Sequence, residues 1–146
     1  MKAVVRWMLL MVMSFAMLRA GAGEVDGVSL GDAHAIRAVI EAQLQAMAEG
    51  DATRAFSYAS PSVRMQFGDA PSFMTMVRQG YPMLIRPSST LFLRPEAVED
   101  AVVQTVHLRG EDGRPWRATY LLQRQKDRSW RINGCMVEPD RGDSVT

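Results

Sequence analysis

Three strands decide the fold of this chain, and they lie in the stretch AVVQTVHLRGEDGRPWRATYLLQRQKDRSWRINGCMV, residues 101–137. Apolar and polar side chains alternate along most of this stretch, with the period of two that is typical of β-strands. Two segments rich in turn-forming residues, 110–113 and 126–129, interrupt the alternation. Connections this short join neighbouring strands in opposite directions, so the sequence predicts an antiparallel meander, preceded by one further strand. The four predicted strands are residues 88–94, 101–109, 116–125 and 130–137.

The same alternation assigns the two faces of the sheet. The even-numbered positions carry the apolar set, so we expect this face to meet the rest of the core. The odd-numbered face is mostly polar but includes Val103, Leu121 and Val137. A β-bulge would reverse part of this assignment. The even-numbered set is Val102, Gln104, Val106, Leu108, Trp116, Ala118, Tyr120, Leu122, Trp130, Ile132, Gly134 and Met136.

The apolar residues of the odd-numbered face suggest a partner. A two-fold interface presents the same patch from both sides, so a second copy lying on the sheet would bury all three residues. A homodimer through the sheet is therefore one expectation. The alternative is that they are scattered surface residues, which require no partner.

The part of the chain before residue 81 has the period of helices instead. Apolar residues recur at steps of three and four from Ile36 to Met47, and Gly50 follows as a C-terminal cap. Further helices are indicated where an acidic or hydroxyl cap precedes an apolar pattern, twice with proline at the helix start. These starts are Asp51, Ser60-Pro61 and Asp69-Ala70-Pro71. Helices first and strands afterwards predict an α+β domain, with helices packed on one face of an antiparallel four-stranded sheet.

The first residues are typical of a secretory signal peptide. Lys2 and Arg6 precede an apolar run from Met8 to Leu18, which is too short to span a bilayer, and Ala20-Gly21-Ala22 resembles a cleavage site. We therefore expect export to the periplasm or beyond, with cleavage after Ala22; the alternative is an uncleaved N-terminal anchor. The expected organisation is a signal peptide at 1–22, a polar lead-in at 23–33, a single domain at 34–138 and a polar tail at 139–146.

Composition narrows the possible functions. The 146 residues include 17 basic and 16 acidic ones, and removal of the signal peptide would leave 14 basic and 16 acidic residues, a net charge of −2. A weakly acidic protein is a poor candidate for nucleic-acid binding, and no stable membrane span is expected after cleavage. One cysteine allows no internal disulfide and no cysteine-based zinc site, and with only two histidines no metal or other cofactor is expected.

Several motifs resemble a bacterial protein family, the domain of unknown function 4864 family. They include Ala55-Phe56-Ser57-Tyr58-Ala59-Ser60-Pro61, Phe73-Met74-Thr75-Met76-Val77, and the closing runs 116–125 and 130–135. The family name implies no activity. The resemblance does imply the nuclear-transport-factor-2-like shape, in which a curved antiparallel sheet wraps around helices to form a cone with a pocket. That superfamily includes isomerases, dehydratases and non-catalytic binding proteins, so the fold does not choose a function.

The residues themselves argue against acid–base catalysis. An apolar cone of the isomerase type needs a buried carboxylate, yet no even-numbered, core-facing strand position holds one. His107 and Cys135 fall on the same predicted face, but on strands that are not neighbours, about 10 Å apart, which is too far for a hydrogen bond. Seven basic residues between 109 and 131 could attract an anionic partner, or could simply be a solvated sheet surface. We therefore predict no catalytic residue.

Aromatic residues are the remaining candidates for function. Large rings usually fill the core of a small domain, but some could line the mouth of the cone and bind a small ligand. The sequence thus favours a non-catalytic module of the cell envelope that binds a ligand or a partner protein. The alternative is a small cofactor-independent enzyme, isomerase- or dehydratase-like, that uses the cone pocket. The candidate pocket residues are Tyr58, Phe67, Tyr81, Trp116 and Tyr120.

Overall fold

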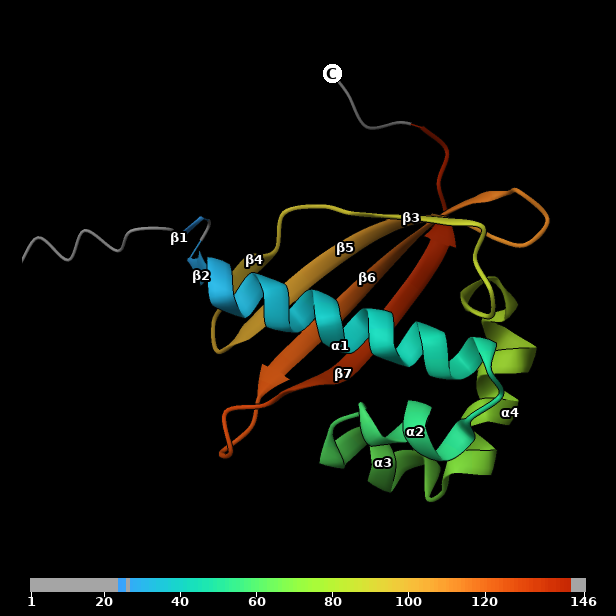
Figure 1. The fold of residues 1–146 in the computed structure, drawn as a ribbon, viewed down its shortest axis with the longest axis horizontal. Coiled ribbons are helices and arrows are strands. Elements are labelled where there is room, and N and C mark those ends of the chain that lie inside the picture. The colour runs from blue at the N-terminus through green and yellow to red at the C-terminus, as the bar shows by residue number, and fades with distance from the viewer. Residues whose placement is uncertain (1–23, 26, 143–146) are drawn as a thin grey trace, which may run out of the picture.

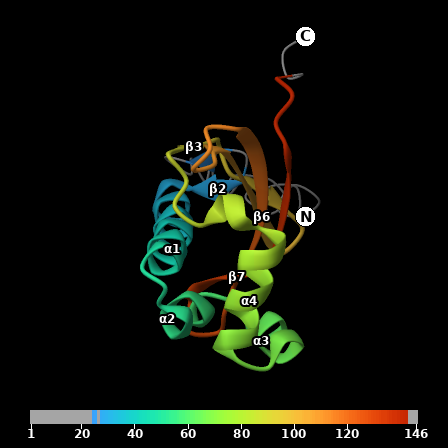
Figure 2. The ribbon, with the colours of Figure 1, turned by 90° about the vertical axis from the view of Figure 1, so that its right-hand side faces the viewer.

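The computed structural model describes residues 24, 25 and 27–142. The expected signal peptide, residues 1–22, lies outside the described residues. The chain forms a helical layer and a sheet layer. Figures 1 and 2 show α1 lying across one face of the sheet and α2, α3 and α4 gathered at one end of the molecule. The predicted α+β class is confirmed.

Helices α2, α3 and α4 begin where the predicted cap residues place them, and α1 begins directly after Ser29. Helix α1 spans Leu30–Ala48, α2 Ala52–Ser57, α3 Pro61–Phe67 and α4 Ala70–Gly80, and a 3-10 turn, η1, follows at Pro82–Leu84. The caps of these α-helices are Ser29, Asp51, Ser60 and Asp69, and each side chain accepts a hydrogen bond from a backbone N–H of the first turn. The sharp turn from α1 into α2 passes through Gly50 at φ 71°, a conformation that favours glycine.

Within the residues that the structure describes, the main sheet has five strands, one more than predicted. They are β3 (Ser89–Phe92), β4 (Glu96–Val98), β5 (Ala101–Arg109), β6 (Pro115–Arg124) and β7 (Trp130–Pro139). The order is β3-β5-β6-β7, all antiparallel, and β4 pairs with β5 beside β3. The edge strand is therefore split in two, and Pro95, which has no backbone N–H, lies in the break.

Both ends of the domain carry structure within the segments expected to be lead-in and tail. A two-stranded ribbon, β1 (Glu24–Val25) and β2 (Val28–Ser29), precedes α1, which itself begins at Leu30. After β7, the backbone N–H of Asp140 donates to the carbonyl of Pro115 (3.1 Å), and the carboxylate of Asp140 pairs with Nδ1 of His107. The tail is thus held to the sheet as far as Asp140.

A β-bulge in β7 corrects the predicted faces. Leu121 pairs with Gly134 whereas Leu122 pairs with Ile132, so Asn133 is the extra residue on the bulged strand. Beyond it the odd-numbered residues turn inward: Cys135 and Val137 pack against the core cluster, while Met136 is 68% exposed. The prediction that Met136 faces the core, and that Cys135 and Val137 face outward, was therefore wrong. On β5 and β6 the predicted inner face is confirmed.

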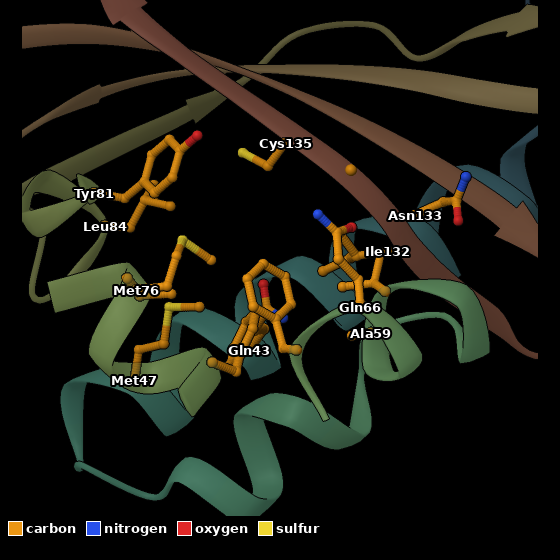
Figure 3. A pocket seen from close by; sticks show the side chains of 15 residues that line it. Gln43, Met47, Ala59, Gln66, Met76, Tyr81, Leu84, Ile132, Asn133 and Cys135 are labelled. Atoms are coloured by element: carbon orange, nitrogen blue, oxygen red, sulfur yellow. The ribbon is translucent and has the colours of Figure 1, made fainter. Parts of the chain in front are cut away.

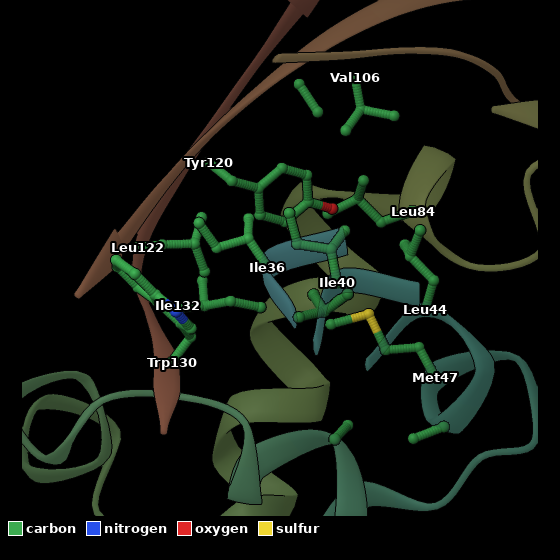
Figure 4. Packing of buried hydrophobic residues seen from close by; sticks show 14 of the residues in the cluster. Ile36, Ile40, Leu44, Met47, Leu84, Val106, Tyr120, Leu122, Trp130 and Ile132 are labelled. Atoms are coloured by element: carbon green, nitrogen blue, oxygen red, sulfur yellow. The ribbon is translucent and has the colours of Figure 1, made fainter. Parts of the chain in front are cut away.

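The core lies between α1 and the inner face of the sheet. Figure 4 shows Ile36, Ile40 and Leu44 of α1 against Val106, Tyr120 and Leu122 of the strands. Ile36, Ile40, Val106 and Leu122 are fully buried. Burying an aliphatic side chain of this size stabilises a fold by about 1.5–3 kcal/mol, so this layer holds α1 on the sheet.

The segment between α2 and α3 closes the free edge of β7. Ala59 forms a parallel bridge with Ile132. The N–H of Ile132 donates to the carbonyl of Tyr58 (2.9 Å), and the N–H of Ser60 donates to the carbonyl of Ile132 (2.8 Å). These contacts fix the start of α3 directly beside the bulge, and so position the pocket described next.

A candidate ligand pocket between α3, α4 and β7

A pocket of about 220 Å³ opens where α3 and α4 meet the bulge of β7. Figure 3 shows Met76 and Tyr81 on one side of it, Gln66 and Asn133 on another, and Cys135 projecting from β7. An apolar cavity of about 150 Å³ is enough for benzene, so this pocket has room for one ring and a small substituent. The pocket is lined by the aromatic residues Phe67, Phe73 and Tyr81, the sulfur-containing residues Met47, Met76 and Cys135, and the amides Gln43, Gln66 and Asn133. The aliphatic residues Ala59, Val63, Val77, Leu84 and Ile132, together with Gly134, complete the lining.

The bulge and the serines of α3 build one wall of the pocket. The Asn133 carbonyl oxygen Oδ1 accepts hydrogen bonds from the hydroxyls of Ser60 (2.7 Å) and Ser62 (2.9 Å). Ser60 is also the cap of α3 and is only 1% exposed. One buried hydroxyl therefore links the start of α3 to the bulge of β7, and this link sets the separation of two pocket walls.

The half-buried thiol of Cys135 and the buried hydroxyl of Tyr120 lie on the sheet side of the pocket. The pKa of Cys135 is raised from 9.0 to about 12, because burial penalises the thiolate more than the contact with Tyr120 favours it. Burial likewise raises the pKa of Tyr120 well above 10.0, and its hydroxyl makes no hydrogen bond of normal geometry within the described part of the chain. Both groups stay neutral at ordinary pH, so neither is an activated nucleophile or base.

Of the five predicted pocket residues, the structure brings two into the pocket. Phe67 and Tyr81 line it, the first from the end of α3 and the second from the end of α4. Tyr120 lies behind the lining, in the core. Tyr58 ends α2, where its hydroxyl contacts the guanidinium of Arg54 and raises the pKa of that group. Trp116 lies near the start of β6, opposite Pro139 at the far end of β7.

Several lining residues were not predicted from the sequence, although a signal existed for some. Gln43 follows Ile36 by seven residues, so helical spacing places it on the buried face of α1, and it is 4% exposed. Asn133 precedes a glycine inside a strand, a pattern that suggests a bulge. For Met47 and Met76 the sequence indicated only burial, since a pocket and a core give the same apolar pattern.

The predicted basic surface is partly neutralised. Within residues 109–131, Arg114 pairs with Asp112 (3.4 Å), Arg117 pairs with Glu138 (2.7 Å), and Arg124 pairs with Asp32. Burial alone would raise the pKa of Asp32, but hydrogen bonds from Ser29, Trp130 and Arg124 outweigh it and lower that pKa. The first pair lies within the turn between β5 and β6, whereas the other two join β6 to β7 and to α1, which favours a structural role for them.

Cys135 and His107 lie on opposite faces of the sheet. The two residues cannot interact, and the described residues contain no group of three or more His, Cys, Asp or Glu side chains able to hold a metal ion. Within the same residues, no helix combines the length and apolar character needed to cross a membrane.

The helices packed on one face of an antiparallel sheet in the order β3-β5-β6-β7 form an NTF2-like fold. A crystal structure of an NTF-2 like protein of unknown function from Silicibacter pomeroyi superposes with a TM-score of 0.54 at 16% identity, covering 77% of this chain and 99% of that one. Residues 29–145 match the family described as Domain of unknown function (DUF4864), and the chain belongs to that family. No curated protein shows significant similarity to this chain.

Proposed function

We propose that this protein is an exported, non-catalytic binding module of the bacterial cell envelope, whose pocket between α3, α4 and β7 takes a small and mostly apolar ligand. One observation carries the proposal: a pocket of about 220 Å³ whose described lining includes no carboxylate, imidazole, amine or guanidinium. Ligand sites are typically apolar and contain only a few polar groups that orient the ligand.

The chemistry of the lining favours binding over an isomerase- or dehydratase-type reaction. Such a reaction needs a group that exchanges a proton near neutral pH. The titratable side chains of the lining are the thiol of Cys135 and the phenol of Tyr81. Since the pKa of Cys135 is raised to about 12, the thiol offers no base under physiological conditions.

Methionine labelling provides a local test of ligand binding. Met47 and Met76 line the pocket, whereas Met65 and Met136 are 83% and 68% exposed elsewhere. With [methyl-¹³C]-methionine in the chain from Gly23 onward, titration with toluene should shift the methyl signals of Met47 and Met76 and leave those of Met65 and Met136 in place. No change in any methyl signal at toluene saturation would contradict a pocket for apolar ligands.

Two tryptophan variants of α3 provide the matched comparison. Val63 lines the pocket and is half-buried, so Val63→Trp fills the space and should abolish the shifts. Met65 lies on the same helix outside the pocket, and Met65→Trp should leave toluene binding unchanged. Equal binding by both variants would place the toluene site somewhere else.

Export is the part of the proposal that rests on residues 1–22. The basic start, the short apolar run and Ala20-Gly21-Ala22 support it. Protein recovered from the cell envelope should begin at Gly23 on N-terminal sequencing. Recovery of chains with an intact Met1 from purified membranes would favour an uncleaved anchor.

The outer face of the sheet is a second candidate binding surface, and we propose a second copy of the chain as its occupant. Leu91, Val98 and Met136 are 63%, 50% and 68% exposed there, beside the half-buried Val103 and Leu121. The described helices pack on the other face (Figure 2). Arg117 on this face already pairs with Glu138, so a copy that covers the face would not bury that guanidinium without a counter-ion.

Sedimentation tests this interface. The chain from Gly23 onward should sediment as a dimer at tens of micromolar, and Met136→Arg should make it a monomer with an unchanged circular dichroism spectrum. A wild-type chain that is already monomeric at that concentration would refute the homodimer.

A further inference from the structure

The polar groups of the pocket specify its ligand more closely than its volume does. Three amides line the cavity: Gln43 from α1, Gln66 from α3 and Asn133 from β7. The Asn133 oxygen already accepts from Ser60 and Ser62, so Gln43 and Gln66 are the two amides whose oxygens remain for a ligand. The Gln43 amide nitrogen donates to the carbonyl of Ala55 (3.1 Å), so this amide is held in place. Its carbonyl oxygen remains to accept a hydrogen bond from a ligand, and the second N–H of the amide remains to donate one.

Gln66 complements this fixed acceptor. Its side chain is exposed, and Figure 3 shows the amide reaching from α3 toward β7 across the pocket. A primary amide both donates and accepts. A ligand that donates to Gln43 and exchanges hydrogen bonds with Gln66 needs a donor and an acceptor on one small group, such as a carboxamide or a lactam.

The absence of charged groups from the described lining decides the charge of the ligand. A buried ion without a counter-ion loses its hydration and gains no compensating partner. Neither a carboxylate nor an ammonium ligand would find an opposite charge in this cavity. The geometry therefore favours a neutral molecule.

The remaining side chains favour an aromatic ring. Phe67 and Phe73 meet edge to face, with ring centroids 5.7 Å apart, and Tyr81 lies at the end of the same helix, α4, that carries Phe73. Met47, Met76 and Cys135 add three sulfur atoms, and sulfur contacts the edges of aromatic rings favourably. Rings and sulfur atoms together offer a better environment to a flat π-system than to a saturated ring.

From this arrangement we infer that the pocket binds an uncharged aromatic molecule of about one ring that bears a carboxamide- or lactam-type group, with Gln43 as the fixed acceptor and Gln66 as the adaptable partner. The inference rests on the proposed binding function and names its ligand class.

Near-isosteric probes test the charge and the ring separately. Benzamide, benzoate and benzamidine share one ring and differ in charge, and cyclohexanecarboxamide keeps the amide without the aromatic ring. Isothermal titration of the chain from Gly23 onward should give benzamide at least tenfold tighter binding than benzoate or benzamidine, and several-fold tighter binding than cyclohexanecarboxamide. Equal or tighter binding of either charged probe would overturn the inference, as would equal binding of the saturated amide.

A pair of glutamine variants tests the role of the amide. Gln66→Leu preserves size and removes the hydrogen-bonding group, so benzamide should lose its advantage over toluene. Gln79→Leu makes the same change at an exposed position of α4 outside this pocket and should leave that advantage intact. If Gln66→Leu leaves the advantage intact, the assignment of Gln66 is wrong. Toluene distinguishes failure of the ligand class from failure of the binding function. If toluene binds but benzamide is not preferred, only the inferred ligand class is wrong. If none of the probes binds, the proposed binding function is wrong.

Discussion

Removal of the Tyr120 hydroxyl should make the protein more stable. Tyr120 is 1% exposed, and its hydroxyl makes no hydrogen bond of normal geometry with a described residue. The thiol of Cys135 is the polar group beside it, and a thiol is a weak hydrogen-bond partner. Figure 4 shows this hydroxyl pointing toward Leu84 in the middle of the core. A hydroxyl that gives up its bonds to water without replacing them costs about 1–3 kcal/mol. Phenylalanine fills the same site without that cost.

The loss of one oxygen atom has a smaller opposing effect. It leaves about 15 Å³ of space, close to one water-sized sphere, and a cavity costs about 24 cal/mol per Å³, or about 0.4 kcal/mol. The net expectation for Tyr120→Phe is a free energy of unfolding higher by about 1 kcal/mol. For a domain of this size the midpoint of thermal unfolding should rise by about 3–5 °C.

Urea unfolding, followed by circular dichroism, measures the free energy of unfolding of both proteins. The slope of that energy against urea concentration, m, should be the same in both, because a change in m would indicate an altered denatured state. Tyr81→Phe is the matched control. The Tyr81 side chain lines the open pocket and is half-buried, so water can reach it and the variant should change stability by less than about 0.5 kcal/mol.

A loss of stability in Tyr120→Phe would refute the reasoning. The hydroxyl would then have a hydrogen-bond partner, and the thiol of Cys135, which is paired with Tyr120 across β6 and β7, is the candidate. A double-mutant cycle with Cys135→Ala would measure that contact, since the two effects would fail to add.

Three further changes test other parts of the structure. Ser60→Ala removes the cap of α3 and its bond to Asn133, so the free energy of unfolding should fall by about 1–2 kcal/mol. Ser62 is exposed, and Ser62→Ala should lower the free energy of unfolding by less than about 0.5 kcal/mol; equal effects of the two variants in urea unfolding would contradict the role of Ser60. The folded-state pKa of Cys135 is raised to about 12 from 9.0, so the contribution of the neutral thiol to stability is complete below pH 9 and is lost between pH 9 and 12. At pH 8, iodoacetamide should therefore alkylate the folded chain about a thousandfold more slowly than the urea-unfolded chain. Equal rates would disprove the raised pKa. The pKa of Asp32 is lowered, so the contribution of its carboxylate to stability is present above about pH 4 and is lost as the pH falls. In Asp32→Asn, the free energy of unfolding should therefore fall less steeply below about pH 4 than in the wild type. An unchanged slope there would show that Arg124 and Trp130 do not favour the ionised carboxylate.

Local chemistry in the sequence determined most of the elements. A side-chain oxygen before a helix satisfies N–H groups of its own first turn, so Asp51, Ser60 and Asp69 mark helix starts whatever the rest of the fold does. Alternation along residues 101–124 likewise assigned the buried face of β5 and β6, because side chains in a regular strand must alternate. Membership of the family and the class of fold were also predictable, since the motifs that carry the resemblance run along the domain.

The Asn133-Gly134 pair suggests a bulge, but only the tertiary structure decided its effect on the neighbouring residues and formed the pocket. Asn133 is displaced because its side chain meets Ser60 and Ser62, which lie more than seventy residues earlier, and no local rule contains that contact. The bulge turns Cys135 inward and Met136 outward, which reverses both predictions for those residues. The pocket combines α1, α3, α4 and β7, and an apolar side chain at its wall follows the same pattern in the sequence as one in the core. The difference between wall and core depends on how distant elements pack, and this packing is a non-local property of the folded chain.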